Sequence, residues 1–110
     1  MPASAKVLLL AAALGFSGAA ATAPDNQRQA ELMHRLKHDC GSCHGLTLKG
    51  GLGPDLRAET LDGAEPEVLA TIILDGVPGT AMPPWRPLLT EDEARWIADY
   101  LLESDAEAAR

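Results

Sequence analysis

The two cysteines of the chain stand three positions apart and are followed directly by a histidine, in the order Cys40-Gly41-Ser42-Cys43-His44. Two thiols at this spacing on one helical turn can each add to a vinyl group of the same porphyrin. The next residue then lies under the iron, where an imidazole nitrogen can bind as the proximal axial ligand. The pattern therefore predicts one covalent c-type haem on Cys40 and Cys43, with His44 as a metal ligand.

Three other uses of a C-x-x-C pair fit this sequence less well. A zinc site needs two more ligands at a matched spacing, and only His34 and His38 are spare. A thioredoxin-like thiol-disulfide oxidoreductase needs a strand before the motif in a βαβ pattern, and the sequence predicts no such strand. A structural disulfide between Cys40 and Cys43 is the third alternative.

The N-terminus has the pattern of a secretory signal peptide. Lys6 supplies a positive charge, residues 7–18 are apolar, and the small residues 19–21 fit a cleavage site. The apolar stretch is short for a membrane span, so an uncleaved anchor is the weaker alternative. We expect residues 1–21 to be removed, leaving residues 22–110 as one monohaem domain. Because bacteria attach haem covalently outside the cytoplasm, the expected location is the periplasm.

The chain is acidic, with 16 Asp and Glu against 9 Lys and Arg and a formal net charge of −7. Such a domain is not expected to bind nucleic acid or to insert into a membrane. The charge favours a protein partner with a basic face, or serves solubility alone. Phe16, the single Phe, lies in the predicted signal peptide. So small a domain with few aromatic side chains has a thin core, and a buried porphyrin would add apolar bulk. We expect a monomer.

The remaining sequence predicts an all-α fold, with three main helices and loops wrapped around one haem. The first helix covers residues 26–39 and leads directly into the haem motif. Its apolar stripe follows helical spacing and consists of Ala30, Leu32, Met33 and Leu36. Residues 45–62 are rich in Gly and turn residues and are predicted to form a loop, tightest at residues 50–54.

The second and third predicted helices have clear boundary signals. Pro66 opens the second helix and Gly76 lies just past its end. Its predicted buried face consists of Val68, Leu69, Ile72 and Ile73. Residues 77–89 form a loop stiffened by prolines. Thr90 and Glu93 form a capping box for the third helix, whose predicted inner face consists of Ala94, Ile97, Tyr100 and Leu101. The polar tail from residue 103 is expected to fray.

The iron has a second axial position, for which the sequence offers Met33, His34, His38 and Met82. His34 and His38 lie on the helix before the motif, on the proximal side, and cannot easily reach the opposite face. Met33 shares that helix and is expected to pack in the core. Met82 precedes Pro83 on a loop, and a residue before proline favours an extended backbone that suits presentation of a thioether. The alternative is that the Met82 side chain fills space in the hydrophobic core. A thioether ligand favours reduced iron and leaves no open position, which indicates electron transfer and not an enzyme.

The order of these motifs resembles that of a class I bacterial cytochrome c. The resemblance rests on residues 40–44, 53–56, 82–85 and 99–101 and covers nearly all of the predicted mature chain. It implies that the carbonyl oxygen of Pro54 accepts a hydrogen bond from Nδ1–H of His44. The alternative is that Pro54 is an ordinary turn residue. It also implies that the first and last helices cross near the haem. At that crossing the family often has a small residue and an aromatic, whereas this chain has Leu32 and Leu36.

A narrower similarity concerns residues 39–45, 50–54, 78–85 and 94–96. They are similar to the small periplasmic cytochromes c encoded beside cytochrome cd1 nitrite reductase in denitrifying bacteria. That similarity implies one-electron donation to the nitrite reductase, with maturation of its d1 haem as the alternative role. Two roles fit Trp85: its indole N–H donates to a haem propionate, or its ring packs over the haem edge.

Overall fold

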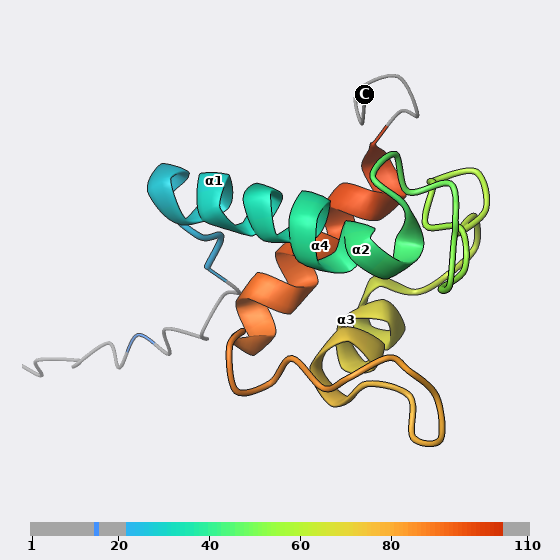
Figure 1. The fold of residues 1–110 in the computed structure, drawn as a ribbon. Helices are drawn as coiled ribbons and strands as arrows, with labels where there is room; N and C mark the ends of the chain where they lie inside the picture. The colour runs from blue at the N-terminus through green and yellow to red at the C-terminus, as the bar shows by residue number, and fades with distance from the viewer. Residues whose placement is uncertain (1–14, 16–21, 105–110) are drawn as a thin grey trace, which may run out of the picture.

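Figure 1 shows the computed structural model, which describes Gly15 and residues 22–104. Within these residues every assigned element is a helix, so the predicted all-α class is confirmed. The elements are α1 (Asn26–Arg35), the π-helix η1 (Leu36–Cys40), α2 (Gly41–His44), α3 (Pro66–Asp75) and α4 (Glu91–Glu103). None of these helices is long and apolar enough to cross a membrane. The predicted signal peptide, apart from Gly15, and residues 105–110 of the tail lie outside the described residues.

The first helix continues through the haem motif, so the predicted end at residue 39 was too early. Gly41 keeps a helical backbone (φ −62°, ψ −22°), and its N–H donates to the carbonyl of Leu36. This five-residue step is a π turn, which joins α1 to α2 without a break. The helical run ends at Gly45, whose φ of +90° suits glycine.

Helix α1 has a side-chain cap at its start and buries only part of the predicted apolar stripe. The side chain of Asp25 caps the helix by accepting from the N–H of Arg28 at 2.8 Å. Leu32 and Leu36 are buried, with 0% and 3% of their surface exposed. Met33 is half-buried against the core, whereas Ala30 is exposed. The buried side is therefore narrower than the predicted stripe.

Helix α3 has the predicted ends but a different buried face. Pro66 occupies its first turn, and Gly76 follows its last residue. The prediction was wrong for Val68 and Ile72, which are exposed, while Ala70 and Leu74 are buried. The small Ala70 lets α3 lie close to a neighbouring element, so the buried side is set by contact and not by side-chain size.

Helix α4 is capped as predicted. The hydroxyl of Thr90 accepts from the N–H of Glu93 at 3.1 Å, and a carboxylate oxygen of Glu93 accepts from the N–H of Thr90 at 2.9 Å. Both bonds of the capping box are therefore present. The buried residues of the helix are Ala94, Ile97, Ala98 and Leu101. Tyr100, expected on the inner face, is half-buried, and its ring stacks on Trp96 with centroids 6.0 Å apart.

Helices α1 and α4 cross in Figure 1 and share one apolar core. Leu32 and Leu36 belong to the same buried cluster as Leu101, and Tyr100 packs against it. The crossing that the resemblance implied is thus present with leucines on the α1 side. The haem motif begins one turn after this core, so the core fixes the helix that carries it.

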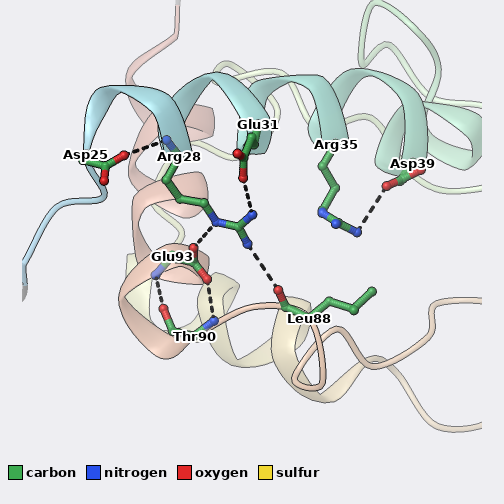
Figure 2. A network of polar contacts seen from close by, with 8 residues as sticks. All are labelled: Asp25, Arg28, Glu31, Arg35, Asp39, Leu88, Thr90 and Glu93. Carbon is green, nitrogen blue, oxygen red and sulfur yellow. Dashed lines mark hydrogen bonds and ion pairs between the residues drawn. The ribbon is translucent and has the colours of Figure 1, made fainter.

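Figure 2 shows a polar network that joins α1 to the start of α4. The Arg28 guanidinium donates to Glu93, to Glu31 at 2.8 Å and to the Leu88 carbonyl oxygen at 3.4 Å. The bond from Arg28 holds the pKa of the Glu93 carboxyl below its ordinary value. Since Glu93 also caps α4 through Thr90, one carboxylate both starts α4 and ties it to α1.

Candidate haem site

The three residues of the attachment motif lie on one continuous helical run. Cys40 is the last residue of η1, and Cys43 and His44 complete α2. Both cysteines are half-buried free thiols, so the structural-disulfide alternative gains no support. Burial raises the pKa of the Cys40 thiol.

His44 has a fixed ring orientation. Its Nδ1 lies 2.8 Å from the carbonyl oxygen of Pro54, the contact that the resemblance implied. A carbonyl oxygen can only accept, so Nδ1 carries the proton and Nε2 is the nitrogen left to face a metal ion. A neutral imidazole with a free Nε2 is the form that binds a metal ion. The Pro54 contact therefore prepares His44 to serve as an iron ligand.

The glycine loop after the motif folds back onto α2. The N–H groups of Gly50 and Gly53 donate to the carbonyls of His44 and Cys43, each at 2.8 Å. A Cβ atom on Gly53 would lie 2.8 Å from both Nδ1 and Cε1 of His44, closer than real Cβ contacts. The sequence predicts a tight turn here. It does not reveal the second reason for glycine at position 53, which is that the His44 imidazole lies against it.

Met82 lies on the loop between α3 and α4, which is fixed at several points. Its carbonyl oxygen accepts from the N–H of Val77 at 3.2 Å, and its N–H donates to the hydroxyl of Thr80 at 3.3 Å. The Met82 carbonyl also packs so closely on Gly76 that a Cβ there would lie 2.6 Å away. Met82 is half-buried. The loop thus holds this residue at a defined position, as a ligand loop must.

Trp85 connects the same loop to two helices. Its backbone N–H donates to the carbonyl of Ile73 on α3 at 3.2 Å, and its ring packs against the core. The guanidinium carbon of Arg35 lies 5.5 Å from the ring centroid, within the range of a cation–π contact. Arg35 also donates to Asp39 at 3.4 Å. Sequence reasoning missed Arg35, because nothing local indicates its contact with so distant a residue.

The donor set fits a c-type haem. Two thiols and a prepared imidazole lie on one helical run, a thioether lies on the loop between α3 and α4, and Leu46, two residues after the motif, is 62% exposed. Within the described residues, no group of three or more His, Cys, Asp or Glu side chains could hold a metal ion, so the zinc alternative lacks a ligand set. A helical fold with this motif on its first helix and a last helix crossing it defines a class I c-type cytochrome.

Comparison with known proteins agrees with this class. The chain belongs to the cytochrome c family, since residues 27–101 match the family described as cytochrome c oxidase, cbb3-type, subunit III. A curated relative called cytochrome c55X, from Paracoccus denitrificans, is 61% identical over 89 residues, which cover 81% of this chain and 86% of the relative. The cytochrome c55X of Stutzerimonas stutzeri is 50% identical over 96 residues, covering 87% and 85%.

Two solved structures are similar in fold. The c-type cytochrome NirC has a TM-score of 0.73 and 53% identity, covering 76% of this chain and 98% of its own. The second is the dihydro-heme d1 dehydrogenase NirN in complex with DHE, with a TM-score of 0.60 and 30% identity. That match covers 66% of this chain and 16% of NirN. The family and these neighbours establish a monohaem c-type cytochrome with covalently bound haem c.

Proposed function

We propose that this chain is a periplasmic one-electron carrier that donates electrons to cytochrome cd1 nitrite reductase. The observation that carries the proposal is the 2.8 Å contact between His44 Nδ1 and the Pro54 carbonyl, which prepares a rigid iron ligand. The similarity to the c-type cytochrome NirC supports the link to nitrite reduction. Electron transfer gains from such rigidity, because a fixed ligand sphere changes little between the two oxidation states.

Each residue of the site has a role in this proposal. The bound haem supplies one reversible electron at its iron. Cys40 and Cys43 would hold the porphyrin by thioether bonds, and His44 would bind the iron through Nε2. Pro54 keeps the proton on Nδ1, which orients the ring and raises its basicity. Met82 would be the second iron ligand and would favour the reduced iron, which would leave no coordination position for a substrate, as expected of an electron carrier and not of an enzyme.

The docking surface lies on two loops that carry few charges, residues 50–53 and 77–84. Leu52 is 80% exposed and Val77 is 40% exposed, so both loops offer apolar side chains to a partner. The chain as a whole is acidic, with a formal net charge of −7. A small apolar contact on an acidic protein suits a brief encounter, because long-range charge steers the approach more than contact area holds the complex.

Stopped-flow mixing of the reduced holoprotein with oxidised cytochrome cd1 nitrite reductase tests the proposal. We expect rapid oxidation of the haem, and a rate that falls with salt as the Debye length shrinks to about 10 Å at 0.1 M. Transfer without salt dependence keeps the donor role and removes charge steering. No transfer at any ionic strength removes the donor role.

Maturation of d1 haem is the second candidate function. The specific observation in its favour is the similarity to part of the dihydro-heme d1 dehydrogenase NirN. A cytochrome that served such an enzyme would exchange electrons during cofactor assembly instead of during nitrite reduction. A deletion strain separates the two roles: loss of d1 haem from the isolated reductase supports maturation, whereas slow nitrite reduction with a normal d1 haem content supports donation.

A further inference from the structure

His34 and His38 lie on the helical run before the haem motif and take no part in the haem site. His34 belongs to α1 and His38 to η1, four positions apart. Their ring centroids are 4.2 Å apart, with ring planes inclined by 41°. Both side chains are exposed, so both rings are open to solvent solutes.

This ring separation suits two imidazoles bound to one metal ion. With metal–nitrogen bonds of about 2.1 Å and a right angle between them, the two ring centroids would lie about 4.5 Å apart. The observed 4.2 Å is close to that separation. Two histidines at positions i and i+4 of a helix are also the arrangement by which helices present paired metal ligands.

The charged neighbours leave the imidazoles as the available donors. Glu31 and Asp39 line the same open recess as His34. Each is engaged by an arginine, Glu31 by Arg28 at 2.8 Å and Asp39 by Arg35 at 3.4 Å. The paired charges largely cancel, so a dication meets little net repulsion on this face. Lys37 is exposed one position before His38 and adds one positive charge.

We propose that His34 and His38 form a two-histidine site for a divalent transition-metal ion. Imidazole nitrogens select ions such as Ni²⁺, Cu²⁺ or Zn²⁺ and disfavour Mg²⁺ and Ca²⁺, which require oxygen ligands. With two protein ligands, water completes the coordination sphere and the ion exchanges readily. The site lies on the same helical run as Cys40 and is separate from the haem ligands.

Calorimetric titration of untagged holoprotein with Ni²⁺ tests the proposal. Ni²⁺ is chosen because it does not exchange electrons with haem under these conditions, and the attached haem removes the cysteine thiols as competing ligands. We expect one Ni²⁺ per chain, and NMR signals of residues 31–38 should broaden first. His34→Ala and His38→Ala should each weaken binding about tenfold or more, because the second bond becomes intramolecular only when both rings are present.

Lys37→Ala is the matched control, since it truncates an exposed side chain on the same turn and removes no ligand. It should leave the affinity unchanged or slightly higher, and a similar titration with Mg²⁺ should show no binding. The proposal is overturned if wild-type protein fails to bind Ni²⁺ at millimolar concentration. It is also overturned if either histidine variant binds as tightly as wild type. Unchanged haem spectra in both variants establish that they remain folded.

Discussion

The guanidinium of Arg35 lies over the indole ring of Trp85, with its central carbon 5.5 Å from the ring centroid. This contact joins the helix that leads into the haem motif to the loop that carries Met82. In the proposed holoprotein these segments supply opposite faces of the iron site, so the contact links the two sides directly.

Arg35→Gln should loosen the Met82 loop. A cation–π contact contributes about 0.5 to 2 kcal/mol, more as it is shielded from water, so the iron–methionine bond should be lost at a lower temperature. The measurement is the sulfur-to-iron charge-transfer band of the ferric protein during heating. Asp39→Asn is the control, because it removes the other partner of Arg35 and leaves the stacking intact. An equal effect of both variants would assign the stabilisation to the ion pair.

Met82→Ala should lower the reduction potential and open the iron to small ligands. Loss of a thioether removes a ligand that favours reduced iron, and the expected shift is on the order of 0.1 V, within the roughly 0.8 V that axial ligands control. Potentiometric titration measures the shift, and an added ligand such as imidazole reports the open position. Met33→Leu on α1 should change neither quantity. A wild-type spectrum without the charge-transfer band would exclude Met82 as a ligand.

Gly53→Ala should disturb His44 although it leaves every ligand in place. The new methyl group would lie 2.8 Å from two atoms of the His44 ring, so the ring or the loop must move. The strain should cost about 1 to 3 kcal/mol of folding free energy. Chemical unfolding followed by haem absorbance measures it.

Gly41→Ala is the matched control within the haem motif. Its backbone is helical and an added Cβ would meet its nearest neighbour at 3.5 Å, an ordinary contact. We expect stability equal to or above that of the wild type, since alanine favours helices. Equal losses in both variants would show that the motif rejects any added carbon, and that the His44 contact is not the reason.

Glu93→Gln should separate the charge of Glu93 from its capping role. Glutamine can still accept from Thr90 in a capping box, but it loses the ion pair with Arg28. We expect a loss of about 1 to 2 kcal/mol in the free energy of unfolding at pH 7, because Glu93 is only 14% exposed and the bond is between charged groups. Glu91→Gln, at a carboxylate that is 83% exposed, should have little effect.

The same pair predicts a pH dependence. Arg28 holds the pKa of Glu93 below its unfolded value, so the pair stabilises the folded protein above that unfolded value. The stabilisation is lost as the pH falls through the lower, folded pKa. The difference between wild type and Glu93→Gln should therefore shrink in acid. A constant difference from pH 7 down to strongly acidic conditions would contradict an ionic origin.

The fold was largely predictable because its boundary signals are local. Pro66, Gly76 and the Thr90–Glu93 box each act within a few residues, and the structure has all three where they were expected. The buried face of α3 was not predictable from the size of its side chains. Val68 and Ile72 are exposed while Ala70 is buried, because the neighbouring helix decides which side is covered.

The candidate haem site also has features that the sequence predicted and features that it did not. The attachment motif is a local pattern, and the Pro54 contact followed from a family resemblance. The close approach of Gly53 to His44 and the stacking of Arg35 on Trp85 depend on how distant segments meet. No spacing rule in the sequence reports such contacts, because their partners are brought together only by the tertiary fold.

The π turn at Leu36–Cys40 determines which side of the helix the haem motif occupies relative to the core leucines. Each residue of an α-helix turns the chain by about 100°, and a π turn accommodates one additional residue without interrupting the helix. Removing one residue from this turn would let α1 and α2 merge into a regular helix with Cys40 and His44 facing nearly their present side. Rewinding the turn into a regular α-helix at unchanged length would instead rotate the haem motif by about 100° relative to Leu32. This stretch should therefore accept the loss of one residue, but not a change of winding at constant length.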